Sequence, residues 1–319
     1  MKPLDIISLG EPMVEFCATS TGSLKDVKLF ESGWGGDTSN MAVAAARLNK
    51  ACGYVCRIGD DEFGRSFLEM WQREKIDTSH VIIEDGSFTG VYFISIVDGG
   101  EHDFTYYRKD SAASHLSPDD IDPEYIKGSR IFHSSGISQA ISTSCREAVF
   151  KAAEIAKSAG AIFSYDPNIR LKLWPINTAR AVVSYTIEMA DIIMPSMEDV
   201  KLITGHSSSE RAAKQILKMG PRIVAIKLGA EGSLIATEDE IIKAPGFTVN
   251  VVDTTGAGDA FDGAFLTGIL EGLGLEKTAR FANATAALKT LGKGAVAPLP
   301  RRSEVEKFLR LWEKTRQLG

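Results

Sequence analysis

A glycine-rich segment in the last quarter of the chain has the composition of an anion-binding turn. It reads Asp253-Thr254-Thr255-Gly256-Ala257-Gly258-Asp259 and joins an apolar β segment to a helix expected over 257–271. Glycines let the backbone turn tightly, so several N–H groups can face one point, and the helix adds its unpaired N–H groups and positive dipole end. Such a point suits the negative charge that develops on a transferring phosphoryl group.

Asp259 follows the last glycine of this segment and is expected in the first turn of the helix. A carboxylate there can accept the proton of a hydroxyl group as that hydroxyl attacks phosphorus. The helix dipole alone also favours an aspartate in the first turn. The local sequence leaves both interpretations open. The segment is not the nucleotide-binding pattern Gly-x-x-x-x-Gly-Lys-Ser/Thr.

A second glycine-rich segment lies near the start of the chain and precedes a helix expected over 40–49. It reads Gly33-Trp34-Gly35-Gly36-Asp37-Thr38-Ser39-Asn40. Two adjacent glycines allow a polyhydroxyl ligand to approach the backbone closely, and Asp37 and Asn40 can bind hydroxyl groups. A loop followed by a helix cap would explain the same pattern.

The elements that must position these segments alternate between strands and helices, which predicts an α/β fold with a parallel sheet. The strands are expected at 4–9, 54–58, 131–133, 162–165, 192–194 and 223–227, and the further helices at 62–74, 145–159, 179–189, 276–291 and 303–317. A hairpin of residues 233–236 and 240–243 is expected near the end of the sheet.

Further β segments interrupt this alternation. They span residues 12–18, 27–31, 89–97 and 102–107, and Asp98-Gly99-Gly100 is the expected turn of a hairpin. We therefore predict a doubly wound α/β domain of residues 1–10, 36–88 and 112–319, with a small β appendage of residues 11–35 and 89–111.

Composition limits the class of protein. The chain has 319 residues, 44% of them hydrophobic and 24% charged, and a net charge of −6, without the basic stripe of a nucleic-acid-binding protein. The spacing of Cys17, Cys52, Cys56 and Cys145 does not complete a zinc site, so reduced thiols are expected. There is no apolar run of membrane-spanning length and no signal-peptide pattern, so we expect a soluble, cytoplasmic protein with no membrane partner.

Taken together, the two glycine segments and the interrupting strands resemble the signatures of the ribokinase-like (PfkB) carbohydrate kinases. The resemblance implies a doubly wound, mostly parallel, three-layer sheet with a small β-sheet lid. It implies that Asp259 is the general base and that Gly256, Ala257 and Gly258 form the anion hole. It also implies ATP and Mg²⁺ as cofactors and a homodimer built through the lid.

The same resemblance extends to a nucleotide site. Leu228-Gly229-Ala230-Glu231-Gly232 resembles the nucleotide-side turn of the family, and residues 283–294 resemble the helix and loop beside adenine. A hairpin turn and an alanine-rich core helix are the plainer interpretations. The implied ATP-binding residues are Asn168, Arg170, Lys227, Gly229, Gly232, Gly256, Gly258 and Asn283.

One departure concerns the metal. The family often carries Asn-x-x-Glu, which helps to organise magnesium and phosphate, and Ser196 and Asp199 stand at these two positions here. A shorter acid can still order metal-bound water, so Asp199 is the expected indirect metal contact.

Two arginines bear on the substrate. A buried carboxylate must be paired with cations, so a sugar acid requires them and a neutral sugar does not. Arg108 and Arg170 are the candidates, although contacts to ATP phosphates or surface ion pairs would also explain them. Their segments, with Ser111-Ala112-Ala113-Ser114, resemble family members that phosphorylate the 6-hydroxyl of 2-keto-3-deoxygluconate.

By this resemblance the residues that bind the sugar acid are Gly35, Gly36, Asn40, Tyr92, Tyr106, Arg108, Ile137, Arg170 and Asp259. Fructokinases carry related segments, so a fructokinase is the alternative enzyme. An idle regulator that binds sugar or nucleotide on the same fold is the alternative of a different class.

Overall fold

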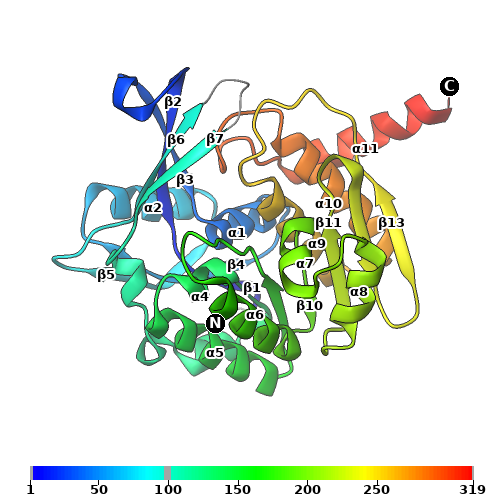
Figure 1. Cartoon of the computed structure of the whole chain (residues 1–319), viewed down its shortest axis with the longest axis horizontal. Coiled ribbons are helices and arrows are strands. Elements are labelled where there is room, and N and C mark those ends of the chain that lie inside the picture. Colours follow the sequence, from blue (N-terminus) through cyan, green and yellow to red (C-terminus); the bar gives the residue numbers. More distant parts are fainter. Residues whose placement is uncertain (1–2, 97–101, 318–319) are drawn as a thin grey trace.

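A nine-stranded sheet forms the centre of the molecule in the computed structural model, which describes residues 3–96 and 102–317 (Figure 1). Its strand order is β13-β12-β11-β10-β9-β8-β1-β4-β5. The strands are β1 (Leu4–Leu9), β4 (Cys52–Gly59), β5 (Asp77–Glu84), β8 (Ser129–Ser135), β9 (Ile162–Asp166), β10 (Ile192–Ile193), β11 (Ile223–Lys227), β12 (Gly232–Ala236) and β13 (Ile241–Pro245). The pairs from β5 to β11 are parallel, and β12 and β13 add an antiparallel hairpin.

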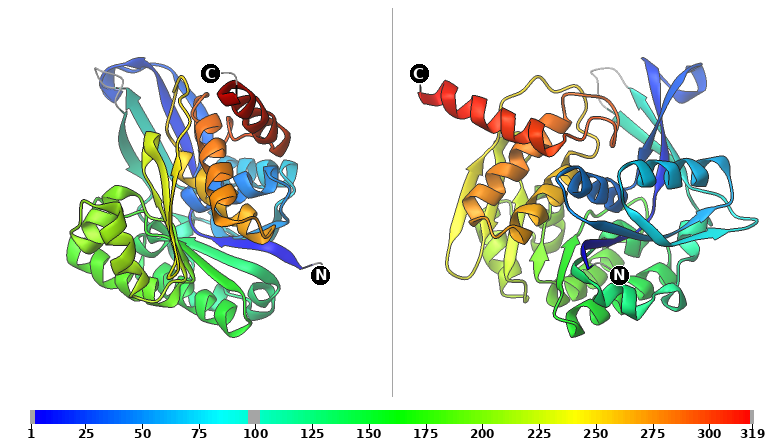
Figure 2. Two further views of the ribbon diagram at one scale, coloured as in Figure 1. Left: turned by 90° about the vertical axis from the view of Figure 1, so that its right-hand side faces the viewer. Right: turned by 180° about the vertical axis from the view of Figure 1, so that it is seen from behind.

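Helices cover both faces of this sheet, so the three-layer, mostly parallel architecture is as predicted (Figure 2). One face packs against α1 (Asp37–Arg47), α2 (Glu62–Arg73), α9 (Ala257–Leu270), α10 (Leu275–Lys289) and α11 (Arg302–Gln317). The other helices are α3 (Pro123–Lys127), α4 (Gly136–Ala140), α5 (Thr143–Ser158), α6 (Ile176–Met189), α7 (Met197–Thr204) and α8 (Ser209–Leu217). Each layer buries its own apolar cluster against the sheet, which is the main source of stability.

A smaller sheet of four strands, here called the lid, stands apart from the large one (Figure 1). Its order is β3-β2-β6-β7, from β2 (Met13–Thr21), β3 (Phe30–Gly35), β6 (Val91–Ile96) and β7 (His102–Tyr107). The strands β2 and β6 pair in parallel and so join two segments that are distant in sequence. The predicted pairing of β6 with β7 is confirmed, whereas the expected turn at residues 98–100 lies outside the described residues.

Two sequence predictions about elements were wrong, and one strand was not predicted. The strand expected at 27–31 lies at Phe30–Gly35, and therefore includes Gly33 and Gly35, for which a loop was one of the two interpretations. The helix expected from residue 40 begins at Asp37. The edge strand β5 was not predicted, because its half-buried and mixed composition carries no clear alternation.

Gly36 explains the first two differences. Its φ is 98°, and a Cβ atom at this position would lie 2.2 Å from the carbonyl oxygen of Glu11. Only glycine adopts this conformation so close to another backbone, and it allows a direct passage from β3 into α1.

The helices α1 and α9 cross at unusually close range. A Cβ atom built on Gly263 of α9 would lie 2.8 Å from the carbonyl oxygen of Met41 and 2.9 Å from Cβ of Ala44. A glycine at the crossing therefore brings the first turns of the two helices, with Asn40 and Asp259, within hydrogen-bonding reach.

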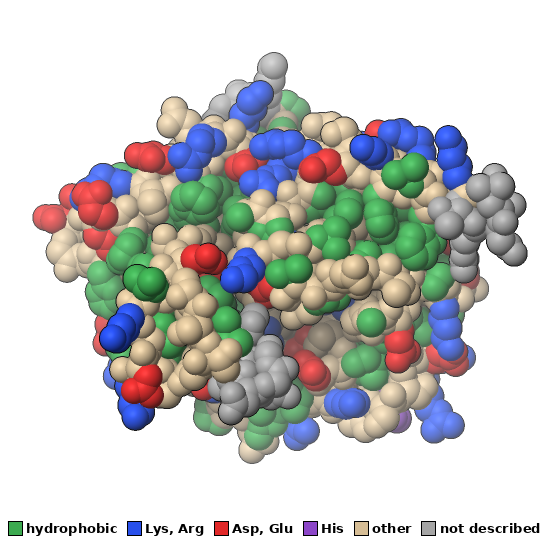
Figure 3. Space-filling view, turned by 90° about the horizontal axis from the view of Figure 1, so that it is seen from above, with side chains coloured by type: hydrophobic (Ala, Val, Ile, Leu, Met, Phe, Trp, Pro, Cys, Tyr) green, Lys and Arg blue, Asp and Glu red, His purple; other side chains and the backbone are tan. Residues whose placement is uncertain are grey.

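Charges of both signs are interspersed on the face of the molecule that is seen from above (Figure 3). No helix within residues 3–96 and 102–317 is long and apolar enough to span a membrane.

Candidate active site

Two cavities meet at the carboxyl ends of the parallel strands. The first, here called the lid cavity, has a volume of about 1020 Å³ and extends from Tyr92 and Arg108 of the lid region to the turn before α9. The second, here called the strand cavity, has a volume of about 820 Å³ and runs along β11 to β13. Both are lined by Ser196, Glu198, Lys227 and Gly258. The cavities are therefore joined into one cleft, as expected at the strand ends of an open α/β sheet.

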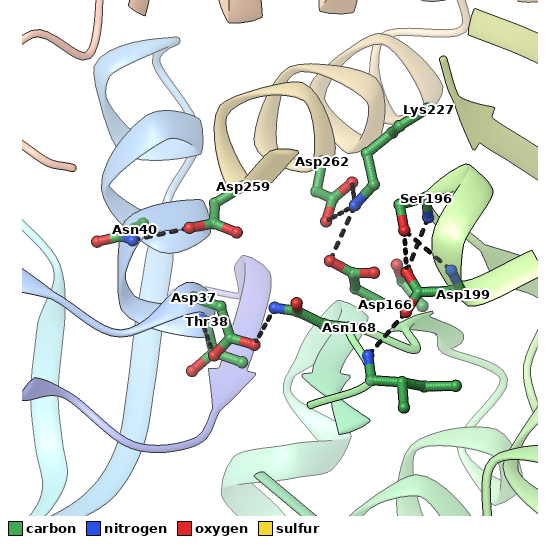
Figure 4. Close-up of polar contacts among 12 residues, drawn as sticks. Asp37, Thr38, Asn40, Asp166, Asn168, Ser196, Asp199, Lys227, Asp259 and Asp262 are labelled. Atoms are coloured by element: carbon green, nitrogen blue, oxygen red, sulfur yellow. Dashed lines mark hydrogen bonds and ion pairs between the residues drawn. The ribbon is translucent and has the colours of Figure 1, made fainter. Parts of the chain in front are cut away.

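Asp259 lies in the first turn of α9, directly after the glycine turn. Gly256 takes a left-handed φ of 76° that ends the turn and starts the helix. Nδ2 of Asn40 donates a hydrogen bond of 2.7 Å to Oδ2 of Asp259 (Figure 4). Burial, together with the nearby carboxylate of Asp37, raises the pKa of Asp259 to about 7, against the opposing effect of Asn40. At neutral pH this carboxyl group can therefore both accept and release a proton.

Lys227 stands at the junction of the two cavities between two buried carboxylates. Its Nζ lies 2.9 Å from Oδ2 of Asp166 and 3.1 Å from Oδ1 of Asp262 (Figure 4). Burial raises the pKa of both aspartates and opposes the charge on Lys227, but the two carboxylates hold the pKa of Lys227 above its usual value. A Cβ atom on Gly258 would lie 3.6 Å from Nζ, so the ammonium group also borders the glycine turn.

Asp199 has a well-defined structural role. Its Oδ2 accepts hydrogen bonds from the backbone N–H and the hydroxyl of Ser196, which closes a capping box at the start of α7. Its Oδ1 accepts from the backbone N–H of Ile169 and so fixes the loop after β9. In the same loop, Nδ2 of Asn168 donates 2.9 Å to Oδ2 of Asp37 (Figure 4). Thus Ser196 and Asp199 connect α7 to a loop that lines the lid cavity.

Arg108 is already paired inside the protein. Its guanidinium group, 8% exposed, forms an ion pair with the buried carboxylate of Glu11, and Ser111 also donates to Glu11. Burial raises the pKa of Glu11, and Arg108 opposes that rise. Among the described residues, Nε of Arg108 has no hydrogen-bond partner. Arg108 is therefore held mainly by Glu11, and the residue lines the lid cavity.

Most of the predicted site residues come together in this cleft. The lid cavity is lined by Gly36, Asn40, Tyr92, Tyr106, Arg108, Ile137, Asn168, Arg170, Asp199, Lys227, Gly256, Gly258 and Asp259, and the strand cavity by Lys227, Gly229 and Gly258. The described residues lining the two cavities do not include Gly35, Ala257, Gly232 and Asn283.

Two of these four residues support a cavity wall from behind. A Cβ atom at Gly35 would lie 2.3 Å from the hydroxyl of Tyr92, so this glycine makes room for the tyrosine. Asn283 donates to the carbonyl oxygens of Ala244 and Pro245, which line the strand cavity.

Sequence reasoning missed Glu11, Asp166 and Asp262 as members of the site. It also missed two residues behind the cavity wall: Glu15, which accepts a hydrogen bond from the hydroxyl of Tyr92, and Lys289, whose Nζ donates to the backbone oxygen of Asp253. The position of Asp262 carried a signal, because it follows Asp259 by three residues and so faces the same side of α9. Glu11 directly follows the first strand of the sheet, at the edge where such folds bind ligands. Lys289 carried no such signal, because its helix reads as an ordinary alanine-rich core element.

Residues 4–302 match the family model described as pfkB family carbohydrate kinase. The chain therefore belongs to the PfkB family of carbohydrate kinases, and it is a phosphotransferase by family. Both the predicted family and the predicted ribokinase-like fold are confirmed.

Individual relatives divide between two substrate classes. The chain is 36% identical to fructokinase-1 of Zea mays, covering 97% of this chain and 98% of the relative. It is 35% identical to 2-dehydro-3-deoxygluconokinase of Bacillus subtilis, covering 96% and 95%. Its structure is similar to a protein described as a ribokinase II from Escherichia coli, in complex with ATP and Mg²⁺, with a TM-score of 0.90 at 29% identity over 96% and 99% of the two chains. The sugar must therefore be inferred from the site.

Removing the ammonium group at the junction tests the charge balance of the cleft. Lys227→Met is expected to lower the free energy of unfolding by about 3–5 kcal/mol, because two buried carboxylates lose their counter-charge. This loss of stability is expected to be larger at pH 8 than at pH 5. Without Lys227, the buried Asp166 and Asp262 have higher pKa values in the folded than in the unfolded chain, so raising the pH favours the unfolded chain, in which they ionise freely. Urea denaturation at both pH values measures it.

The matched control for that measurement is Lys243→Met. Lys243 lines the strand cavity but is largely exposed and pairs with the exposed Glu210. Its substitution is expected to change the free energy of unfolding by less than about 0.5 kcal/mol. Equal effects of the two substitutions would contradict the role assigned to the buried lysine.

Proposed function

We propose that the protein transfers the γ-phosphoryl group of ATP to the 6-hydroxyl of 2-keto-3-deoxygluconate, also named 2-dehydro-3-deoxygluconate, with Mg²⁺ bound beside the nucleotide. The observation that carries the choice of a sugar acid is that one cavity, the lid cavity, is lined by Tyr106 together with Arg108, Arg170 and Lys172. Burial raises the pKa of Tyr106, and Arg170, Arg108 and Lys172 oppose this rise, so all three cations act on its phenol group.

Cations gathered at a buried polar site favour an anionic ligand. A carboxylate removed from water must be paired and hydrogen-bonded, and guanidinium groups do this best. Arg170 and Lys172 line the cavity with Arg108, whose Nε has no partner among the described residues. The carboxylate of the sugar acid would lie against these groups and the phenol of Tyr106.

A proton acceptor stands at another wall of the same cavity. The raised pKa of Asp259 matches the proton affinity that general-base catalysis needs near neutral pH. The backbone N–H groups of Gly256, Ala257 and Gly258 lie at the start of α9, where the helix dipole favours the charge on the transferring phosphoryl group. Lys227 adds a positive charge beside Gly258.

The strand cavity is the place we assign to the nucleotide, because it borders Lys227 and the glycine turn at Gly258. ATP as the nucleotide is supported by the similar Escherichia coli protein, which is described in complex with ATP and Mg²⁺. Mg²⁺, when bound, would neutralise phosphate charge. The residues present fit such a cation: Oδ1 of Asp166 is a buried acceptor without a described donor, and Glu198 lines both cavities. Asp199 would act only indirectly, because both of its oxygens already accept protein hydrogen bonds.

Fructose is the second candidate substrate. Glu11 already balances the charge of Arg108, which lowers the need for an anionic ligand, and the identity to fructokinase is as high as that to the sugar-acid kinase. Lys172 likewise pairs with the exposed Asp103, so Arg170 is the cation that favours the acid.

An assay of ADP release across 2-keto-3-deoxygluconate, fructose, ribose and adenosine distinguishes the two candidates. The sugar acid is expected to have the highest kcat/KM. Arg170→Met is expected to raise KM for the acid by about 10–100-fold, the value of a lost charged hydrogen bond, and to leave KM for fructose unchanged. Lys109→Met, at an exposed neighbouring lysine, is the control. Faster turnover of fructose, or a rise in KM for ATP alone, would contradict the assignment.

The pH dependence tests the proton acceptor. We expect kcat/KM to rise with pH through about 7, because Asp259 must lose its proton to act as a base. Asn40→Ala removes a donor that stabilises the carboxylate, so the midpoint should move upward by about one pH unit. Asp259→Asn should lower the rate by at least about 100-fold. Asn177→Ala, at an exposed asparagine, is the control. An unshifted midpoint in Asn40→Ala would show that the hydrogen bond from Asn40 does not influence the pKa of Asp259.

We also propose that two chains associate through the outer face of the lid. Phe16, Phe30, Phe93 and Tyr107 form a connected row of rings there, with centroids 5.2 Å apart for Phe16 and Phe93 and 5.8 Å apart for Phe93 and Tyr107. Tyr107 is 61% exposed in the single chain. A connected aromatic face of this kind is typical of a protein interface.

Light scattering after size-exclusion chromatography tests this association. The wild-type chain is expected to have twice the mass of one chain, and Phe93→Asp to have the single mass, because a charge in a desolvated aromatic interface has no partner. Tyr185→Asp, at an exposed tyrosine of α6, is expected to leave the mass unchanged. A single-chain mass for the wild type would disprove the dimer.

A further inference from the structure

We propose that Lys289 is a positioning residue whose buried ammonium group holds the glycine turn in place, and that this built-in cation makes the enzyme independent of dissociable alkali cations. The inference rests on the proposed function for its activity measurements. It adds a buried residue that supports the anion hole of Gly256, Ala257 and Gly258 from the side away from the cavity.

Lys289 is the last residue of α10 and is 0% exposed. Its Nζ donates a hydrogen bond of 2.9 Å to the backbone carbonyl oxygen of Asp253, the first residue of the glycine segment. A fully buried lysine is rare and costly, since its charge must leave water. Such a residue is retained where its charge is needed by its surroundings.

The segment that Lys289 contacts is joined to the end of α10 by further bonds. The backbone N–H groups of Val252 and Asp253 both donate to the carbonyl oxygen of Thr290, the residue after Lys289. The carboxylate of Asp253 accepts from the backbone N–H of Thr255 and, at 2.8 Å, from that of Gly294. Lys289 therefore completes a clamp between the loop after α10 and the turn that presents Gly256.

The carboxylates that act electrostatically on Lys289 come from three different segments of the chain. Burial lowers the pKa of Lys289, and the carboxylates of Asp253, Glu15 and Asp259 oppose that effect. Glu15 belongs to β2 of the lid, accepts a hydrogen bond of 2.6 Å from the hydroxyl of Tyr92, and lies beside Gly294. The single ammonium group thus reduces the mutual repulsion of a lid residue, the glycine turn and the proton acceptor.

The oxygen atoms around the ammonium group of Lys289 would bind a free cation if the lysine side chain were shortened. Backbone carbonyl and carboxylate oxygens are the ligands that hard cations prefer. In the wild-type chain the place is taken by a group that is covalently attached and cannot dissociate. Alkali cations should therefore have no effect on the wild-type enzyme and should restore a variant that lacks the ammonium group.

The first measurement uses the unmodified protein. Its rate of ADP release, with whichever of the four sugars it turns over, is compared in potassium, sodium and tetramethylammonium buffers. We expect rates equal within about twofold. A requirement for potassium or sodium would overturn the proposal, and this result does not depend on how any variant folds.

The second measurement uses Lys289→Ala and Lys289→Met. In tetramethylammonium buffer we expect kcat to fall by about 100-fold, the cost of a displaced catalytic group, with a smaller change in KM. In Lys289→Ala, the addition of potassium, ammonium or methylammonium ions should raise kcat again by at least about tenfold. Wild-type kcat in both variants, or a folded variant that no cation restores, would overturn the proposal.

Thermal unfolding separates this proposal from the proposed function. Potassium is expected to raise the Tm of Lys289→Ala relative to tetramethylammonium and to leave the wild-type Tm unchanged, whether or not any of the four sugars is phosphorylated. Equal shifts in the two proteins would contradict a cation site. Lys277→Ala, at an exposed lysine near the start of the same helix α10, is the matched control and should behave as the wild type throughout.

Discussion

The mutual repulsion of buried carboxylates at the carboxyl ends of the strands is the constraint on which the site depends. Asp166, Asp259 and Asp262 lie within one electrostatic neighbourhood, and burial raises the pKa of each. Lys227 compensates this charge from the side of the sheet, and Lys289 from behind the glycine turn. As a result, the pKa of Asp259 lies near 7, so both of its protonation states are populated at neutral pH. Asp166 and Asp262 are instead held in ion pairs with Lys227.

Local geometry made part of this site predictable. The turn at Gly256 requires a left-handed conformation and is followed at once by a helix, so both features are visible in adjacent residues. The alternation of strands and helices was predictable as well, because each element is indicated by the pattern of buried hydrophobic residues within a short segment. The family resemblance then assigned roles to residues that local patterns left ambiguous, such as Asn40 and Arg108.

Contacts between distant segments could not be predicted in this way. Glu11 and Arg108 are 97 residues apart and meet only because the lid region closes on the end of β1. Lys289 and Asp253 are separated by 36 residues and meet because α9 and α10 pack side by side. The start of α1 was misplaced for a related reason, since Gly36 is selected by the approach of Glu11 rather than by its own neighbours in sequence.

The division of the cleft into two cavities has a kinetic consequence. None of the described residues that line the strand cavity belongs to the lid, whereas Met13, Tyr92, Phe104 and Tyr106 of the lid line the other cavity. If the sugar binds in the lid cavity and the nucleotide in the strand cavity, as proposed above, a movement of the lid would admit or retain the sugar and leave the nucleotide path open. On this proposal, spent nucleotide could leave and fresh nucleotide enter while a sugar remains enclosed by the lid.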